Sequence, residues 1–270
     1  MTYRRTTWIL LRGLTREVSH WGDFPVRLHQ VLGEASVVLP IDLPGNGSLS
    51  HMPSPRTVPQ MLDACRAQVA AAGLRPPFHV LAMSLGGMVA VEWMHRSPDE
   101  LAACVLLNTS LRPYSPFYHR LRPRSYLELL HLALVWGQAA TAETLIHRLT
   151  SRSDDFLVSN VSRWAAIRTA RPVSRANALR QLVAAARYHP ASKTPAVPVL
   201  LLSGQRDGLV NSRCSAAIAS AWSCAAEKHP AAGHDLPLDA PEWVVTRISQ
   251  WLSALDSTAL VCGNEFTRLP

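Results

Sequence analysis

The stretch His79-Val80-Leu81-Ala82-Met83-Ser84-Leu85-Gly86-Gly87-Met88 places an apolar run directly before a serine and a helical pattern directly after it. A strand that passes through small-x-Ser-x-Gly into a helix is typical of the nucleophile elbow, a sharp and strained turn that holds a serine hydroxyl above a sheet. Ala82 and Gly86 provide the small volume that this turn requires, with alanine where the pattern more often has glycine. Ser84 is therefore a candidate nucleophile, and its ordinary alternative role is that of a helix N-cap.

A serine hydroxyl needs a neighbouring base before it can attack, and that base needs a carboxylate to orient it. His234 lies in Ala231-Ala232-Gly233-His234-Asp235, shortly after the last predicted strand, and Asp207 follows the apolar run Leu200-Leu201-Leu202. The alternatives are a structural loop histidine and an Asx turn at Asp207-Gly208. The chain order Ser84, Asp207, His234 favours a catalytic triad.

Acyl chemistry also requires N–H donors for the oxyanion. We expect one from the backbone of Leu85, directly after the serine, and the other from Leu14 in the segment Leu11-Arg12-Gly13-Leu14. Gly13 could instead be a plain turn glycine. Backbone groups serve this purpose, so the side chains at these positions are free to vary.

Short apolar runs bounded by turn residues alternate with helical patterns along most of the chain. This alternation predicts an α/β fold with a mostly parallel sheet flanked by helices. The predicted strands cover 8–11, 36–41, 78–83, 104–108, 199–203 and 227–229. The predicted helices cover 21–32, 58–72, 85–96, 211–222 and 241–255.

Residues 111–190 interrupt the alternation with helical patterns punctuated only by prolines. We interpret this segment as a helical cap, or lid, inserted into a core formed by 1–110 and 191–256. Residues 257–270 have no counterpart in the scheme and are assigned to a C-terminal extension.

Composition indicates a compact globular protein, since 48% of the 270 residues are hydrophobic and 17% are charged. No apolar run approaches the roughly 18 residues of a membrane span. The five cysteines are odd in number and form no C-x-x-C pair, which favours a reduced, cytoplasmic setting. No pattern points to a cofactor or a metal ion.

The net charge of +8 is concentrated in the predicted cap. Residues 111–190 contain twelve arginines against Glu128, Glu143, Asp154 and Asp155, and so hold the whole excess. Such a surface is either simply solvated or attracts an acidic partner, for example an acyl carrier protein or coenzyme A. Nucleic acid is not favoured as a partner, because no recognised nucleic-acid-binding motif is present.

Over residues 8–255 the chain resembles the α/β-hydrolase superfamily, particularly its small bacterial esterase-like serine hydrolases with a helical cap. Leu11-Arg12-Gly13-Leu14 is similar to the family's His-Gly oxyanion segment, with Arg12 in place of histidine. Asp42-Leu43-Pro44-Gly45-Asn46-Gly47 is similar to its Asp-x-Pro-Gly-x-Gly element, and the closing Gly-His and Pro-Glu match Gly233-His234 and Pro241-Glu242. Family members usually begin with an additional antiparallel hairpin, which this N-terminus lacks or retains only in part.

The resemblance implies hydrolysis of a small carboxylic ester through an acyl-enzyme on Ser84. Amides, thioesters and lactones use the same machinery, and a thioesterase or esterase acting on a carrier-bound acyl group is one alternative. Another is a non-catalytic binding protein on the same scaffold. Dehalogenase chemistry is disfavoured, because the dehalogenases that the chain resembles have aspartate at the position of Ser84. Aromatic residues that either line a substrate pocket or only pack the cap are Trp21, Phe117, Tyr118, Trp136 and Trp164.

Overall fold

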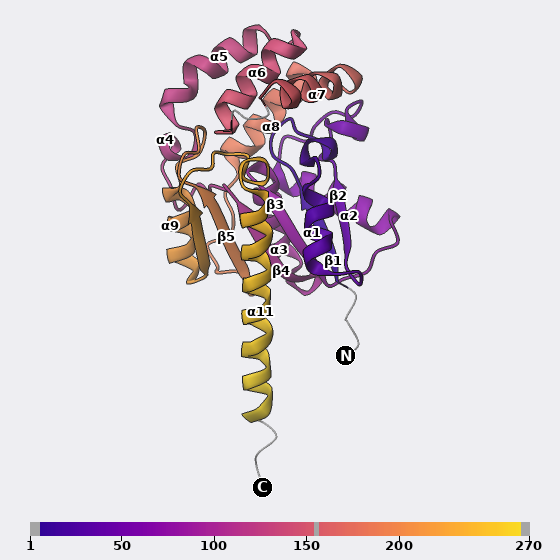
Figure 1. Ribbon diagram of the computed structural model, residues 1–270, viewed down its shortest axis with the longest axis vertical. Coiled ribbons are helices and arrows are strands. Elements are labelled where there is room, and N and C mark those ends of the chain that lie inside the picture. The colour runs from indigo at the N-terminus through magenta and orange to yellow at the C-terminus, as the bar shows by residue number, and fades with distance from the viewer. Residues whose placement is uncertain (1–5, 154–156, 266–270) are drawn as a thin grey trace.

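A six-stranded parallel sheet forms the centre of the computed structural model, which describes residues 6–153 and 157–265 (Figure 1). The strand order is β2-β1-β3-β4-β5-β6, and every neighbouring pair is parallel. Within the described residues no antiparallel strand precedes β1. The strands are β1 (Thr7–Leu11), β2 (Val37–Ile41), β3 (Phe78–Met83), β4 (Leu101–Leu107), β5 (Val199–Gly204) and β6 (Ala225–His229).

The inner strands consist of continuous apolar runs because helices cover both faces of the sheet. In β1, Trp8 and Leu10 belong to one buried cluster, and Ile9 and Leu11 belong to the other. The first cluster includes residues of α1 (Phe24–Leu32) and α11 (Pro241–Glu265). The second includes residues of α2 (Val58–Ala71), α3 (Leu85–Arg96) and α9 (Arg213–Trp222).

Among the described residues, five further α-helices lie between β4 and β5 in the chain, and in Figure 1 α5, α6 and α7 lie beyond one end of the sheet. They contact loops that follow the strands: the N–H of Asp235 donates to the Thr150 carbonyl at 2.8 Å, and the N–H of Arg122 donates to the Leu209 carbonyl at 2.8 Å. The inserted helices therefore adjoin the carboxyl edge of the sheet. They are α4 (Phe117–Arg120), α5 (Tyr126–Leu134), α6 (Ala139–Thr150), α7 (Leu157–Ala170) and α8 (Arg175–Arg187).

Several element ends differ from those predicted. The helix expected over 21–32 begins at Phe24, because Gly22 has a φ of 56° and Pro25 occupies the first turn. The strand expected from 104 begins at Leu101. The helix expected to end at 255 continues to Glu265, so the range 257–265, predicted to be an extension, prolongs α11. Residues 266–270 lie outside the described residues. In the described parts of the chain, no helix combines the length and the apolar character needed to cross a membrane.

Candidate active site

Ser84 lies between β3 and α3 in a conformation that L-residues rarely adopt, with φ 54° and ψ −114°. Its N–H donates to the Leu107 carbonyl at 2.9 Å, so the pairing of β3 with β4 runs up to the serine. The turn depends on Gly86, where a Cβ would lie 2.6 Å from the Arg12 carbonyl oxygen. Strain of this kind costs about 1–3 kcal/mol and is typical of functional positions. The Ser84 side chain itself is only partly buried.

His234 and Asp207, from the loops after β6 and β5, form a buried pair in which Nδ1 lies 2.7 Å from Oδ2. The other carboxylate oxygen of Asp207, Oδ1, accepts hydrogen bonds from the N–H groups of Leu209 and Val210 at 2.7 and 2.9 Å. An ionised carboxylate can only accept hydrogen bonds, so a bond to Asp207 requires a proton on Nδ1 and, in the neutral imidazole, leaves the lone pair on Nε2. This is the tautomer that a general base acting on a serine requires.

Asn108, directly after β4, connects these loops and was not singled out from the sequence. Its side-chain N–H groups donate to the carbonyls of Gly233 and His234 at 3.2 and 2.7 Å, and its Oδ1 accepts from the N–H of Gly204 at 2.9 Å. The side chain is buried and the backbone is left-handed, with φ 48°. The only signal in the sequence is a polar residue at the end of a predicted strand, which is too common to indicate this role.

Arg12, which stands where the resembling family has histidine, forms a bidentate ion pair with Asp235. The two N–O distances are 3.1 and 2.6 Å, and the side chains are only 2% and 3% exposed. The guanidinium also donates to the Met83 sulfur at 3.5 Å and lies 4.8 Å above the Trp21 ring. Arg12 therefore contacts both the residue before Ser84 and the residue after His234.

The ion pair determines the charge of Asp235. Burial alone would raise the pKa of this carboxyl, but the charge of Arg12 and its hydrogen bonds outweigh burial and hold the pKa below its ordinary value. The carboxylate is therefore ionised at neutral pH. Since the N–H of Asp235 also bonds to the end of α6, this residue joins the loop after β1, the His234 loop and the inserted helices.

The two predicted oxyanion donors belong to segments next to Ser84. Leu85 is the first residue of α3, and Leu14 follows Gly13, where a Cβ would lie 3.2 Å from the Ser84 Cβ. The next N–H along this loop, that of Thr15, donates to Gln181 of α8 at 2.8 Å. The loop after β1 is thus fixed by an inserted helix, and the assignment of Leu14 and Leu85 as oxyanion donors stays a prediction.

A buried charged cluster, made of Arg16, His20, Glu143, Trp164 and Arg168, joins the loop after β1 to α6 and α7. Glu143 accepts from Arg16 at 2.6 Å and from Arg168 at 2.9 Å, and the Arg16 guanidinium lies 4.3 Å above the Trp164 ring. Burial, and then the charge of Arg16, lower the pKa of His20 well below its ordinary value. His20 is therefore neutral at pH 7, and the positive charge of the cluster resides on its arginines.

The structure does not gather the five aromatic pocket candidates in one place. Trp21 is buried beneath Arg12, and Trp164 is buried within the charged cluster. Trp136 is partly buried, and its N–H donates to a backbone carbonyl at 2.9 Å. Phe117 and Tyr118, on α4, are 72% and 48% exposed. Their role as pocket residues stays a prediction.

Metal-binding groups do not converge in the described residues. No three histidine, cysteine, aspartate or glutamate side chains there come close enough together to hold a metal ion.

A model of the alpha/beta hydrolase family matches residues 8–247. No match was found among curated proteins. Among solved structures, the enol-lactonase from Burkholderia xenovorans LB400 has a TM-score of 0.74 at 16% identity, over 93% of this chain and 92% of that one. A thermophilic esterase from Thermogutta terrifontis has a TM-score of 0.70 at 20% identity, over 93% and 90%. A bacterial membrane phospholipase A has a TM-score of 0.75 at 20% identity, over 93% and 80%. At such identities these likenesses show a shared fold.

Proposed function

Because the chain belongs to the alpha/beta hydrolase family, we propose that it is a serine hydrolase that cleaves a small carboxylic ester, with Ser84 as nucleophile, His234 as general base and Asp207 as the orienting acid. The observation that carries this proposal is the strained Ser84 at the end of β3, combined with a His234–Asp207 pair 2.7 Å apart in the loops after β6 and β5. Arg12 contacts the neighbours of both Ser84 and His234, which supports their convergence.

The reaction proceeds in two halves. His234 Nε2 takes the proton of the Ser84 hydroxyl as Oγ attacks the ester carbonyl, and the N–H groups of Leu14 and Leu85 stabilise the oxyanion. The intermediate collapses, the alcohol leaves with the proton held by His234, and an acyl-enzyme remains. Water then gives a proton to His234 and attacks the acyl group, which releases the acid and regenerates Ser84.

The choice of an ester over an amide is supported by the neighbouring structures. The three described above are named as a lactonase, an esterase and a phospholipase, all of which act on ester bonds. No step requires a cofactor. The odd number of cysteines favours a reducing, cytoplasmic setting for this reaction.

Steady-state hydrolysis of p-nitrophenyl esters of increasing chain length tests the proposal and measures the length of acyl chain accepted. We expect saturable turnover by the wild-type enzyme and a loss of at least a thousandfold in kcat for Ser84→Ala. Ser253→Ala, on an exposed part of α11, is the matched control and should keep wild-type kcat. Equal turnover by all three proteins would contradict the proposal.

A second candidate is a thioesterase or esterase that acts on an acyl group held by an acidic carrier. The observation that favours it is the excess of arginine in residues 111–190. Steering by charge weakens as salt screens it. We therefore expect kcat/KM for a coenzyme A thioester to fall with rising salt while kcat/KM for the matching free ester stays constant. Identical salt dependence would exclude the carrier.

A further inference from the structure

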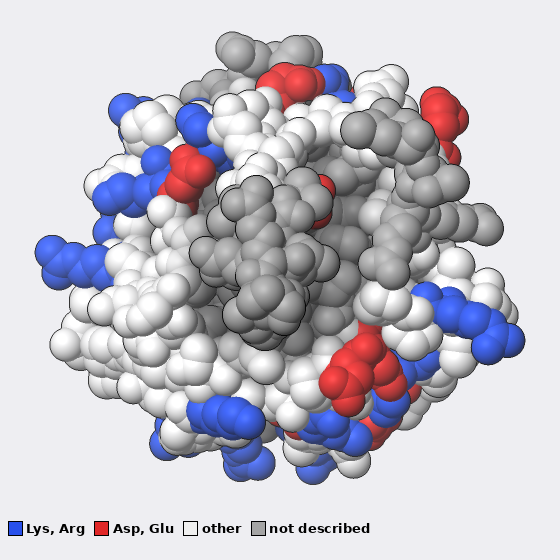
Figure 2. Space-filling model, turned by 90° about the horizontal axis from the view of Figure 1, so that it is seen from below, with Lys and Arg blue, Asp and Glu red and all other residues white. Residues whose placement is uncertain are grey.

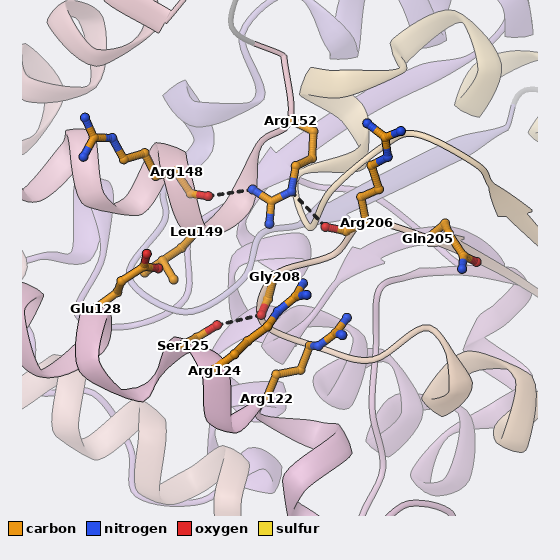
Figure 3. Close-up of a pocket in the computed structure, with 10 residues that line it drawn as sticks. All are labelled: Arg122, Arg124, Ser125, Glu128, Arg148, Leu149, Arg152, Gln205, Arg206 and Gly208. Atoms are coloured by element: carbon orange, nitrogen blue, oxygen red, sulfur yellow. Dashed lines mark hydrogen bonds between the residues drawn. The ribbon is translucent and has the colours of Figure 1, made fainter.

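A cavity of about 620 Å³ opens between the inserted helices and the loop that carries Asp207 (Figure 3). Its volume lies in the range of small-molecule sites, but such sites are usually apolar and this one has a single aliphatic side chain, Leu149, in its wall. It is therefore unsuited to an acyl chain. Its wall has one acidic residue, Glu128, and five arginines, namely Arg122, Arg124, Arg148, Arg152 and Arg206.

Within the described part of the chain, the positive charge of this arginine pocket exceeds the negative charge of its one acidic residue, Glu128. None of the five arginines forms an ion pair there, whereas Arg12, Arg16 and Arg168 each reach a carboxylate. Asp154 and Asp155 lie outside the described residues. At the opposite end of the molecule, basic and acidic side chains are interspersed around the rim (Figure 2). The excess of positive charge is thus a feature of the pocket.

The guanidinium groups are close enough to repel one another. Burial and the charge of Arg124, with a smaller effect of Arg152, lower the pKa of Arg122, and the Asp207 carboxylate only partly opposes them. Figure 3 shows Arg122 and Arg124 extending side by side near Gly208. Repulsion of this kind destabilises the folded chain, and an anion bound between the arginines would offset it.

Backbone carbonyls hold three of the guanidinium groups in place. Arg122 and Arg124 both donate to the Asp207 carbonyl, at 2.9 and 3.0 Å, and Arg152 donates to the Arg206 carbonyl at 3.0 Å. Each guanidinium has five N–H donors, so donors remain for a ligand. Groups fixed in advance lose less conformational entropy when a ligand binds.

We propose that the arginine pocket binds a small polyanion that carries phosphate groups. The planar guanidinium matches phosphate oxygens in a bidentate geometry, and five such groups around one cavity suit a ligand with two or more phosphates. Free polyphosphates and the phosphates of coenzyme A share this chemistry. The site contains neither Ser84 nor His234, so binding there does not depend on the proposed hydrolysis.

Isothermal titration calorimetry with inorganic pyrophosphate and with coenzyme A, at ionic strength held constant with NaCl, tests this site. We expect saturable binding at one site. The double variant Arg148→Gln/Arg206→Gln removes two side chains that make no hydrogen bond to a described residue, so the fold should persist. It should weaken binding at least tenfold.

The matched control is Arg56→Gln/Arg75→Gln, which removes the same charge from exposed positions away from the pocket and should change Kd by less than twofold. Binding of coenzyme A at least tenfold tighter than pyrophosphate would identify a carrier as the source of the phosphates, and equal binding would indicate a free polyphosphate. No saturable binding of either probe by the wild-type protein would overturn the proposal, as would equal weakening by the two double variants. Ser84→Ala should bind both probes normally, which separates failure of this site from failure of the hydrolase assignment.

Discussion

Ser84 has an unfavourable backbone conformation, with a positive φ of 54°, and contacts on both sides of the turn hold it there. Glycine at position 86 lets α3 approach the loop after β1, and the N–H of Ser84 remains bonded to β4. The serine alone is a weak nucleophile. In the proposed mechanism its reactivity depends on His234, whose Nδ1 lies within hydrogen-bond distance of Asp207, at 2.7 Å.

Asp207→Asn should lower kcat for a short p-nitrophenyl ester by about three to four orders of magnitude, because an amide N–H facing Nδ1 stabilises the wrong tautomer of His234. KM should change little, since Asp207 is not expected to contact the substrate. Asp63→Asn, at a 54% exposed side chain, is the control for steady-state kinetics. Wild-type kcat in Asp207→Asn would exclude an orienting role for this carboxylate.

Removing one partner of the buried Arg12–Asp235 ion pair should destabilise the fold, whereas replacing both partners with apolar residues should not. Arg12→Met leaves the Asp235 carboxylate buried without its partner and should reduce the free energy of unfolding by about 3–5 kcal/mol. The double variant Arg12→Met/Asp235→Leu removes both charges and should recover much of that loss in urea denaturation. A double variant less stable than Arg12→Met would contradict this view of the pair.

The lowered pKa of Asp235 also predicts a dependence on pH. A carboxyl whose pKa is lower in the folded state stabilises the fold above its unfolded pKa, about 3.9. That contribution disappears as pH falls through the folded pKa. Below about pH 4 the wild type should therefore lose more stability than Arg12→Met/Asp235→Leu. Parallel pH profiles of the two proteins would argue against the ion pair as the cause.

The strands could be predicted where both faces of the sheet are buried, because a buried strand is a continuous apolar run in the sequence. β3 and α3 lie where the sequence placed them, because an apolar run, a small-residue turn and a helical pattern follow one another there. β6 (Ala225–His229) lies at an exposed edge of the sheet and has the sequence AAEKH. Its hydrophobic pattern is therefore too weak to predict a strand clearly. Element ends were less predictable, since they depend on local features such as the positive φ of Gly22.

The junction of α3 with the loop after β1 is the contact between elements that positions Ser84. In Gly86→Ala the new Cβ would meet the Arg12 carbonyl at 2.6 Å, so α3 must move away from the loop after β1. We expect a lower Tm together with a loss of kcat. Gly137→Ala, where a Cβ meets no atom within 4 Å, should leave both unchanged. A fully active Gly86→Ala would show that the close approach is not needed.

At the scale of the whole molecule, the features that could not be predicted are contacts between residues far apart in the sequence. Asp207 and His234 were recognisable because each follows a strand in a known chain order. Arg12 and Asp235 are 223 residues apart, and neither carries a local signal of their pairing. Asn108 and the charged cluster around Glu143 depend in the same way on how the inserted helices and the loops meet at the sheet edge.

The C-terminal part of α11 extends away from the rest of the molecule (Figure 1). A chain that ends after Asp256 keeps Val244, Val245 and Ile248, the α11 residues buried against the sheet. We therefore expect the free energy of unfolding to change by well under about 1 kcal/mol, which corresponds to a Tm within about 2 °C of that of the full chain. Ester hydrolysis should be unchanged. A much lower Tm would show that this part of the helix has a stabilising contact.

The central claim is that Ser84 is activated by His234. Its most direct test is reaction with a fluorophosphonate, followed by mass spectrometry of the peptides. The account predicts stoichiometric modification at Ser84 in the wild type, none in Ser84→Ala, and a reaction slowed at least a hundredfold in His234→Ala. Modification of another serine, or labelling of Ser84 at the same rate without His234, would contradict it.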